Sequence, residues 1–479
     1  MTEPDFPPIE TLRRIHFIAI AGVGMASLAG MLRTRGFTVT GSDRDVYPPA
    51  STMLERLEIP VLSGFRAENL DPAPDLVVVG NAVSRTNPEV QAVLERGLAY
   101  ASMPETLRRL LLPGKRSLVV AGTHGKSTST AMLGWVLERA GRDPSLMVGG
   151  ESIDFGGNFR LGGGDDFVIE GDEYDTAFFD KGPKFLHYEP RGLILTSIEF
   201  DHADIYRDLD HVTRSFVDLL RIVPSGSPIV ACPDFARVER ALNRGGRPAE
   251  RFGFSQAADW RPAEVRDDGG RTRFEVRFHG RLEAEIALRA MGEMNVRNAL
   301  GVFALARGLG LAAADIVPAL DEFRGVRRRQ EILADGAVTV IDDFAHHPTA
   351  IAATLDAVRR RHPGRRLWAV FEPRSNTSRR RVFQEEFPRA LAVADRILLA
   401  EPYVKPTDPL PEAERLSAAA VVEDITRRGR TAAAFADPGD IFAELRREVV
   451  PGDVVVFLSN GAFGGLPRRF AEAAGGVTR

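Results

Sequence analysis

The sequence has 479 residues and a net charge of −4, with 44% hydrophobic and 27% charged residues. A single hydrophobic core stops growing near roughly 250–300 residues, so we expect about three domains in a chain of this length. The composition is that of a globular protein and excludes a disordered or fibrous chain. The slightly acidic balance lacks the positive charge that binding to nucleic acid or to an anionic membrane surface requires.

A single cysteine, Cys232, excludes an intrachain disulfide and a cysteine-based metal cluster, and it fits a reducing compartment. The first residues are acidic and lack the basic and apolar regions of a signal peptide. No apolar run reaches the roughly 18–20 residues that a membrane helix needs. We therefore expect a cytoplasmic protein with no membrane insertion and no nucleic-acid partner.

The first part of the chain alternates strand and helix signals, which predicts a parallel sheet. A break at Pro113 and Gly114 ends this part, so we place a first domain at residues 1–112. The signals are, in chain order, a strand at residues 15–20, a helix at 25–33, and strands at 37–40 and 75–79.

A glycine-rich turn joins the first strand to the first helix. Gly22 and Gly24 are followed about twenty residues later by Asp43, which is the spacing of a dinucleotide-binding turn, but Ser27 stands where the third glycine belongs. From spacing alone, the turn could bind a nicotinamide-type cofactor or another nucleotide-linked ligand, or it could be a structural tight turn.

A second domain, placed at residues 113–325, opens with a strand and a glycine-rich loop that precedes a helix at residues 127–139. Glycines let backbone N–H groups approach a phosphate, and the start of a helix favours negative charge. Lys126 is then expected to hold the β- and γ-phosphates and Ser127 to offer its hydroxyl to magnesium. Val120 occupies the first glycine position of the general phosphate-loop motif, so the match is imperfect.

Further strands of this domain are expected at residues 167–169, 193–195 and 229–231, and residues 250–290 alternate apolar and charged residues as antiparallel strands do. Acidic residues follow two of these strands, beginning at Glu170 and Glu199, and the second group contains His202. Carboxyl ends of parallel strands meet at one edge of a sheet, so these groups and the phosphate loop are expected to lie together. Oxygen ligands of this kind suit magnesium.

The last part of the chain, placed at residues 326–479, repeats the strand and loop pattern. Ahead of it, near the end of the second domain, Asn295 and Asn298 lie three apart at the start of a helix, where amides can pair with an adenine edge or cap the helix. The basic run that ends at Arg329 could stabilise charge on a transferring phosphoryl group. Two loops of functional type, at residues 342–348 and 371–377, close strands, and the second offers Arg374 to a carboxylate.

Taken in this order, the segments resemble the Mur ligase family over residues 15–463, and they are most similar to the branch that acts on UDP-N-acetylmuramate. The resemblance rests on four motifs, Gly22-Val23-Gly24-Met25, Gly122-Thr123-His124-Gly125-Lys126-Ser127-Thr128, Glu170-Gly171-Asp172-Glu173-Tyr174-Asp175 and Asp342-Asp343-Phe344-Ala345-His346-His347-Pro348. It implies an α/β protein of three domains: a Rossmann-like UDP-binding domain, a central P-loop ATPase domain with a parallel and a small antiparallel sheet, and a C-terminal Rossmann-like domain that binds the incoming peptide.

The resemblance also implies an activity, the ATP-dependent joining of UDP-N-acetylmuramate to the murein tripeptide L-alanyl-γ-D-glutamyl-meso-diaminopimelate through an acyl phosphate. Residues 170–181, 184–188, 199–204 and 371–377 look like the tripeptide-adding enzymes, and the alternative is addition of L-alanine. Magnesium is the implied cofactor.

The residues that the resemblance assigns fall into five groups. They are Lys126, Arg329 and His202 for catalysis; Gly122, Thr123, His124, Gly125, Lys126, Ser127, Thr128, Asn295 and Asp343 for ATP; Ser127, Glu170 and His202 for the metal; Gly22, Val23, Gly24, Met25 and Asp43 for UDP-muramate; and Arg374, Ser375, Asn376 and Thr377 for the peptide.

Overall fold

The computed structural model describes residues 6–48, 50–201, 203, 205–268, 270–404 and 409–475. The chain divides into two compact units, which are treated separately below. The first consists of Met1–Ile198, Asp210–Asp259 and Gly301–Ala319, and the second of Glu199–Leu209, Trp260–Leu300 and Leu320–Arg479. The bounds expected from the sequence for three domains, residues 1–112, 113–325 and 326–479, stay predictions.

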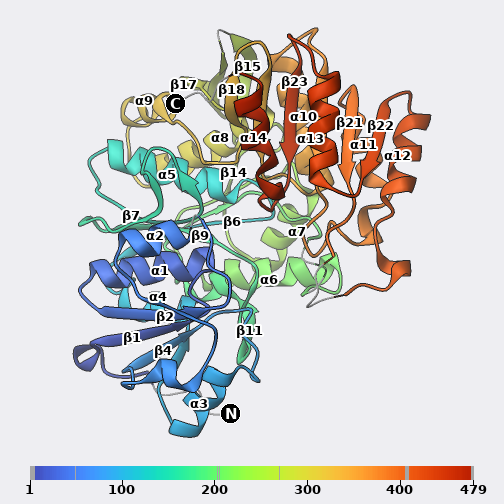
Figure 1. The fold of residues 1–479 in the computed structure, drawn as a ribbon. Helices are drawn as coiled ribbons and strands as arrows, with labels where there is room; N and C mark the ends of the chain where they lie inside the picture. The colour runs from blue at the N-terminus through green and yellow to red at the C-terminus, as the bar shows by residue number, and fades with distance from the viewer. Residues whose placement is uncertain are drawn as a thin grey trace. The chain divides into compact units, whose positions relative to one another are not determined.

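The first unit begins with a five-stranded parallel sheet of order β3-β2-β1-β4-β5 (blue in Figure 1). The parallel sheet that the alternating pattern predicts is therefore present. The edge strands β3 and β5 were not predicted, because three residues are too few to carry a periodic signal. The elements are β1 (Arg14–Ile18), α1 (Val23–Thr34), β2 (Thr38–Asp43), α2 (Ala50–Arg56), β3 (Val61–Ser63), β4 (Leu76–Val79), α3 (Pro88–Arg96), β5 (Tyr100–Ser102) and α4 (Met103–Leu110).

A seven-stranded sheet of order β14-β13-β12-β6-β9-β7-β8 is the second large sheet of this unit, with the phosphate-loop strand β6 at its centre. Its strands are parallel except for β8, which pairs antiparallel with β7. The elements are β6 (Arg116–Ala121), α5 (Lys126–Arg139), β7 (Ser145–Ser152), β8 (Gly157–Arg160), β9 (Asp166–Gly171), β12 (Gly192–Leu195), α6 (Leu209–Ile222), β13 (Ile229–Ala231), α7 (Ala236–Gly245) and β14 (Glu250–Arg251).

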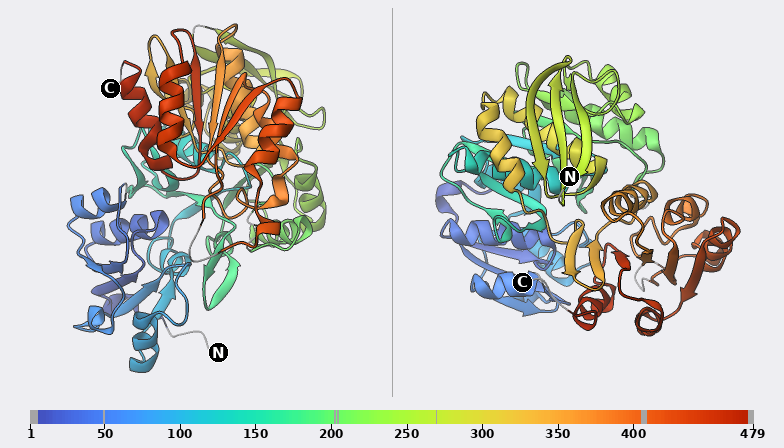
Figure 2. Two further views of the ribbon diagram at one scale, coloured as in Figure 1. Left: turned by 45° about the vertical axis from the view of Figure 1, so that its right-hand side comes forward. Right: turned by 90° about the horizontal axis from the view of Figure 1, so that it is seen from above.

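A two-stranded antiparallel hairpin follows β9 directly. Its strands are β10 (Asp175–Ala177) and β11 (Asp180–Pro183), and a 3-10 turn, η3 (Lys184–His187), comes next. Figure 1 and the left-hand view of Figure 2 show the hairpin beside the N-terminal sheet.

The second unit contains the predicted antiparallel strands, which form a three-stranded sheet of order β15-β16-β17. The right-hand view of Figure 2 shows these strands side by side in yellow-green. The elements are β15 (Trp260–Asp268), β16 (Arg271–Phe278) and β17 (Arg281–Leu288), and they precede α8 (Gly292–Gly308) and α9 (Ala313–Glu322), which contribute residues to both units.

A six-stranded sheet of order β18-β19-β23-β20-β21-β22 forms the C-terminal part, and only β18 runs antiparallel among its described strands (orange and red in Figure 1). Alternate residues of β20 point into two cores, Ala369 and Phe371 into one and Trp368 and Val370 into the other. The first core also contains residues of α10, α11 and α12, and the second contains residues of α13 and α14. Helices therefore cover both faces, as a mostly parallel sheet requires.

The elements of this part are β18 (Glu331–Asp335), β19 (Thr339–Asp343), α10 (Pro348–Arg361), β20 (Leu367–Phe371), α11 (Glu386–Leu391), β21 (Arg396–Ala400), α12 (Ala418–Arg427), β22 (Thr431–Phe435), α13 (Pro438–Glu448), β23 (Val454–Leu458) and α14 (Leu466–Ala473). Among the helices of the described residues, none combines the length and the apolar character that crossing a membrane needs.

Candidate active site

The phosphate loop adopts a backbone that only glycine fits at its first position. Gly122 has φ +138°, and a Cβ added there would overlap Thr196 Oγ1 and lie 2.8 Å from the backbone nitrogen of Ser197. Gly125, with φ +80°, caps the start of α5 in the left-handed conformation. Because a side chain would be strained at both positions, the two glycines determine the shape of the loop and bring its backbone to the start of α5, where the helix dipole favours negative charge.

Two residues after β12 brace this loop from the neighbouring strand. Ser197 Oγ accepts the N–H of His124 at 2.9 Å, and Ser197 O accepts that of Thr123 at 3.0 Å. Thr196 Oγ1 donates to the carbonyl of His124 at 2.6 Å. Sequence reasoning missed both residues, although their place at the carboxyl end of a strand adjacent to β6 was the available signal.

Lys126 is paired with a carboxylate inside the protein. Its Nζ lies 2.8 Å from Glu173 Oε2 and donates to the Gly122 carbonyl at 2.6 Å, and the side chains of Lys126 and Glu173 are 13% and 2% exposed. Burial alone would lower the pKa of Lys126, but the carboxylates of Glu173, Asp172 and Glu170 outweigh it and hold the pKa above its usual value. The lysine therefore stays charged, and Glu173 is a site residue that the sequence reasoning did not single out.

Ser127 and Glu170 lie together, as expected for residues that share a ligand. Ser127 Oγ donates to Glu170 Oε1 at 3.0 Å, and Glu170 Oε2 accepts the N–H of Gly149 at 2.6 Å. The hydroxyl and carboxylate oxygens are the donors that a hard divalent cation prefers, so this pair fits magnesium. His202, the third expected ligand, lies outside the described residues.

The glycine-rich turn at the end of β1 is held by the carboxylate that we assigned to ligand binding. Asp43 Oδ2 accepts the N–H of Ala21 at 2.9 Å, and Asp43 Oδ1 accepts that of Arg44 at 2.7 Å. Val23 and Gly24 form the first turn of α1, and Val23 is exposed while Met25 is buried. Asp43 thus fixes the shape of the turn by hydrogen bonds to its backbone.

In the second unit, the expected nucleoside contacts form one buried network. Asn298 Nδ2 donates to Asn295 Oδ1 at 3.1 Å, and Asn295 Nδ2 donates to Gln330 Oε1 at 3.0 Å. The backbone N–H of Gln330 in turn reaches Asp343 Oδ2 at 2.8 Å. Burial raises the pKa of Asp343, although Arg329 opposes this, and the Arg329 guanidinium lies 4.6 Å from the ring centre of Phe344. The structure therefore brings Asn295, Arg329 and Asp343 to one place.

The neighbouring Asp342 is a buried carboxyl with an unusual pKa. Burial raises its pKa to about 6, because the nearby carboxylates of Asp343 and Glu331 add to the effect and the ion pair with Arg328 at 3.2 Å only partly offsets it. A folded-state pKa above the unfolded value means that the folded protein binds this proton more tightly. Stability from Asp342 is therefore fully present below its usual pKa near 3.8 and is lost as the pH rises through 6.

Replacing Asp342 by asparagine should remove this pH dependence. The free energy of unfolding of the wild type should fall by about 3 kcal/mol relative to Asp342→Asn between about pH 3 and pH 8. Urea unfolding across this range measures the difference, and Asp356→Asn, at an exposed position of α10, is the matched control. Parallel stability profiles for the wild type and Asp342→Asn would contradict the expectation.

The expected peptide loop after β20 is only partly open. Arg374 lies 3.5 Å from Glu372 Oε1 and 4.1 Å from the ring centre of Tyr403, and its side chain is 36% exposed. Ser375 Oγ bonds Ser378 Oγ at 2.9 Å. Thr377 is 1% exposed and accepts the N–H of Ala203 at 3.2 Å. Thr377 therefore holds the loop in place, and the guanidinium of Arg374 stays partly exposed beside Glu372. Asn376 is half-buried, and its carbonyl accepts Arg380 Nε at 3.2 Å.

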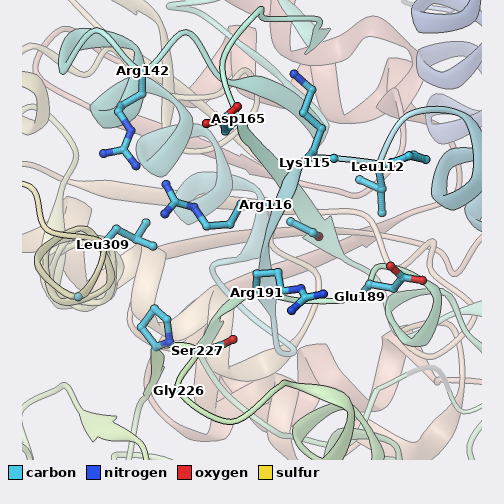
Figure 3. Close-up of a pocket in the computed structure, with 15 residues that line it drawn as sticks. Leu112, Lys115, Arg116, Arg142, Asp165, Glu189, Arg191, Gly226, Ser227 and Leu309 are labelled. Carbon is cyan, nitrogen blue, oxygen red and sulfur yellow. The ribbon is translucent and has the colours of Figure 1, made fainter.

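Figure 3 shows a pocket of about 860 Å³ at the opposite edge of the central sheet. Arg116 begins β6 and Arg191 precedes β12, so the pocket lies at the amino ends of these strands. Arg116 and Arg142 extend toward the same space, and both pair with the buried Asp166, at 2.6 and 3.3 Å. The single carboxylate of Asp166 thus offsets part of the charge of the two arginines, and the pocket is separate from the phosphate loop.

A glycine-shaped loop between a parallel strand and a helix, with a lysine paired to a buried carboxylate and a hydroxyl beside a second carboxylate, defines a protein that binds the phosphates of a nucleotide. Three family models match the chain: the catalytic domain of the Mur ligase family at residues 14–113, the Mur ligase middle domain at 120–306 and the glutamate ligase domain at 328–461.

Individual relatives match over nearly the full length. The UDP-N-acetylmuramate–L-alanyl-γ-D-glutamyl-meso-2,6-diaminoheptandioate ligase of Escherichia coli K12 is 40% identical over 96% of this chain and 98% of its own. A UDP-N-acetylmuramate–L-alanine ligase of Halorhodospira halophila is 36% identical over 98% of this chain and 94% of its own. The crystal structure of a murein peptide ligase from Psychrobacter arcticus aligns with a TM-score of 0.72 and 35% identity, covering 98% of this chain and 100% of that one. The chain therefore belongs to the Mur ligase family and is an ATP-dependent ligase.

Proposed function

We propose that this ligase joins UDP-N-acetylmuramate to L-alanyl-γ-D-glutamyl-meso-diaminopimelate, with cleavage of ATP to ADP and phosphate, and that it serves peptidoglycan recycling. The observation that carries the proposal is the 40% identity, over nearly the whole of both chains, to a relative named for this reaction. The L-alanine ligases are the second candidate, supported by 36% identity over a similar length. ATP and nucleotide-linked sugars are intracellular metabolites, so the cytoplasm is the proposed compartment.

The proposed reaction proceeds in two steps. An oxygen of the muramoyl lactyl carboxylate attacks the γ-phosphorus, the bond to ADP breaks, and an acyl phosphate forms. The α-amine of the peptide then attacks the acyl carbon, and the tetrahedral intermediate expels phosphate and releases a proton as the amide forms. Catalysis of such transfers depends mainly on positioning and on charge neutralisation, for which Lys126 and the loop backbone are suited.

Ser127 and Glu170, with His202, are the residues proposed to hold magnesium. A bound cation would supply further neutralisation of the phosphate oxygens. The 3.0 Å hydrogen bond between Ser127 Oγ and Glu170 Oε1 supports the first two assignments, because it shows two oxygen donors already aligned beside the loop.

The remaining assignments are proposals of the same kind. Arg329 is suited to a phosphate, Asn295 and Asp343 to the nucleoside, and the turn at Gly22, Val23, Gly24 and Met25 to the UDP pyrophosphate, with Asp43 shaping that turn. For the peptide, Arg374, Ser375 and Asn376 are the proposed contacts, and Thr377 supports their loop. The bounds proposed for the domains that carry these sites are residues 1–112, 113–325 and 326–479.

A phosphate-release assay with UDP-N-acetylmuramate, ATP and magnesium tests the function. The tripeptide should support turnover with kcat/KM at least about 10²-fold above that for L-alanine. L-alanine lacks the additional polar groups of the tripeptide, so the polar side chains of the site that bind those groups would be left without partners. Reactions that lack UDP-N-acetylmuramate serve as the control for contaminating phosphatase. Turnover with L-alanine but not with tripeptide would replace the proposal by the second candidate.

A further inference from the structure

The hairpin of β10 and β11 connects two regions of the first unit that the proposed reaction must align. At its base, Glu173 pairs with Lys126 of the phosphate loop at 2.8 Å. At its tip, Phe178 and Phe179 pack against a hydrophobic cluster of the N-terminal sheet. One short segment thus contacts the phosphate loop with one end and the proposed UDP-sugar domain with the other.

The tip is fixed by aromatic packing. The Phe179 ring lies 5.0 Å from that of Tyr100 on β5 and 5.0 Å from that of Phe178, both edge to face. The cluster beneath includes Ile18 and Val79, the last residues of β1 and β4. Ile18 stands four residues before Gly22, so the hairpin tip packs next to the strand end from which the glycine-rich turn emerges.

The base is fixed by polar contacts on both sides of the hairpin. Lys184 Nζ lies 2.8 Å from Asp172 Oδ2, and its side chain is 12% exposed. His187 Nε2 lies 2.7 Å from Asp180 Oδ2 and so ties the second strand to η3. Thr176, fully buried, donates to the carbonyl of Gly182 at 2.8 Å across the hairpin. These contacts leave the hairpin little freedom to bend between its base and its tip.

We propose that the β10–β11 hairpin positions the glycine-rich turn relative to the phosphate loop, and that Phe179 is the positioning residue through which it acts. The inference rests on the proposed function, because it takes the turn to hold the UDP-sugar. In-line attack of a carboxylate on the γ-phosphorus needs the reacting atoms about 3–3.5 Å apart, and an error near 1 Å lowers the rate by about 10²-fold. Phe179 packs against the N-terminal sheet and sets this distance from the far end of the hairpin.

Phe179→Ala is the test, with steady-state kinetics for each substrate separately. We expect kcat to fall by about 10- to 100-fold and the KM for UDP-N-acetylmuramate to rise several-fold, while the KM for ATP stays within about 2-fold of the wild type. Phe179→Tyr, which keeps the ring, should restore both values. Partial unfolding would instead lower kcat and leave both KM values unchanged, so the split between the two KM values identifies positioning.

Phe155→Ala is the matched control. Phe155 is also half-buried in the first unit and also forms an edge-to-face pair, 5.8 Å from Trp135, but it lies outside the hairpin. It should leave the KM for UDP-N-acetylmuramate unchanged. Asp180→Asn, which weakens the contact with His187 without emptying the core, should raise that KM in the same direction as Phe179→Ala.

The proposal would be overturned if folded Phe179→Ala kept the wild-type kcat and the wild-type KM for UDP-N-acetylmuramate. It would also be overturned if the KM for ATP rose by the same factor, or if Phe155→Ala had the same effect as Phe179→Ala. Calorimetric titration with UDP-N-acetylmuramate in the absence of any amine measures binding of the sugar nucleotide directly. It therefore tests the role of the hairpin separately from the identity of the amine substrate. If the wild type uses L-alanine instead of tripeptide, the function fails while the weaker sugar-nucleotide binding of Phe179→Ala still supports the hairpin.

Discussion

Lys126→Ala is expected to lose turnover by at least about 10³-fold, because the ammonium that neutralises the β- and γ-phosphates is removed. The loss should appear in kcat in the phosphate-release assay with saturating UDP-N-acetylmuramate and tripeptide. Lys126→Arg keeps the charge but not the compact ammonium that lies between Glu173 and the Gly122 carbonyl, so it should recover only part of the rate.

Lys126→Ala should also lower the stability of the fold. A lysine that faced only phosphate could be removed without this loss. Glu173 is 2% exposed and would remain buried without its cation, and breaking a buried pair in this way costs about 3–5 kcal/mol. Adding Glu173→Gln to Lys126→Ala should restore most of the free energy of unfolding in urea and none of the turnover. An active Lys126→Ala protein would remove the phosphate loop from the mechanism.

Gly122→Ala is expected to have the second largest effect, a fall in kcat of about 10²-fold or more together with a loss of ADP binding. Alanine is strained at φ +138°, and its Cβ would lie 2.8 Å from the backbone nitrogen and carbonyl oxygen of Ser197. The loop can relieve this overlap only by leaving Thr196 and Ser197, which hold its backbone. Calorimetric titration with ADP measures the binding directly.

Gly114→Ala separates backbone strain from steric overlap. Gly114 also has a positive φ, +75°, but among the described residues no heavy atom lies within 4 Å of a Cβ built there. This control should lose a little stability and keep ADP binding and turnover. If both alanine variants behave alike, overlap with Thr196 and Ser197 does not explain the requirement for Gly122.

Strand ends were the part of the site that the sequence predicted well. The apolar run before Gly122 became β6 and the helix after it became α5, and Glu170 lies near the carboxyl end of β9, at the edge where the loop lies. These predictions succeed because an apolar run, a glycine turn and a helix start are local signals, and parallel pairing then brings their carboxyl ends together.

Contacts between distant residues were less predictable. Asp43 has the spacing of a ribose-binding carboxylate, yet its two oxygens accept backbone N–H groups of Ala21 and Arg44, and spacing alone does not reveal which donors surround a carboxylate. Glu173 and Asp172 belong to one acidic run, but Glu173 pairs with Lys126 and Asp172 with Lys184. The direction in which each side chain leaves the chain after β9 decides this, and that direction depends on tertiary packing.

Two alanine triplets show the limit of composition as a guide to local structure. Residues 418–420 begin α12, because Ser417 caps it and accepts the N–H of Ala420 at 3.2 Å. Residues 432–434 instead form the edge strand β22, paired in parallel with β21. The secondary structure of an alanine triplet is therefore determined by its neighbours. In one case these include a capping hydroxyl, and in the other a partner strand.

The ion pair of Lys126 with Glu173 makes nucleotide binding an exchange of partners. An incoming phosphate group must compete with a carboxylate that already satisfies the ammonium, so its net gain is the difference between two ion pairs. A ligand with several phosphates can place more negative charge at the start of α5, where the helix dipole offsets that difference, whereas a single phosphate ion carries less charge to that position. The resting enzyme should consequently discriminate against free phosphate, which favours release of one product while ATP continues to bind.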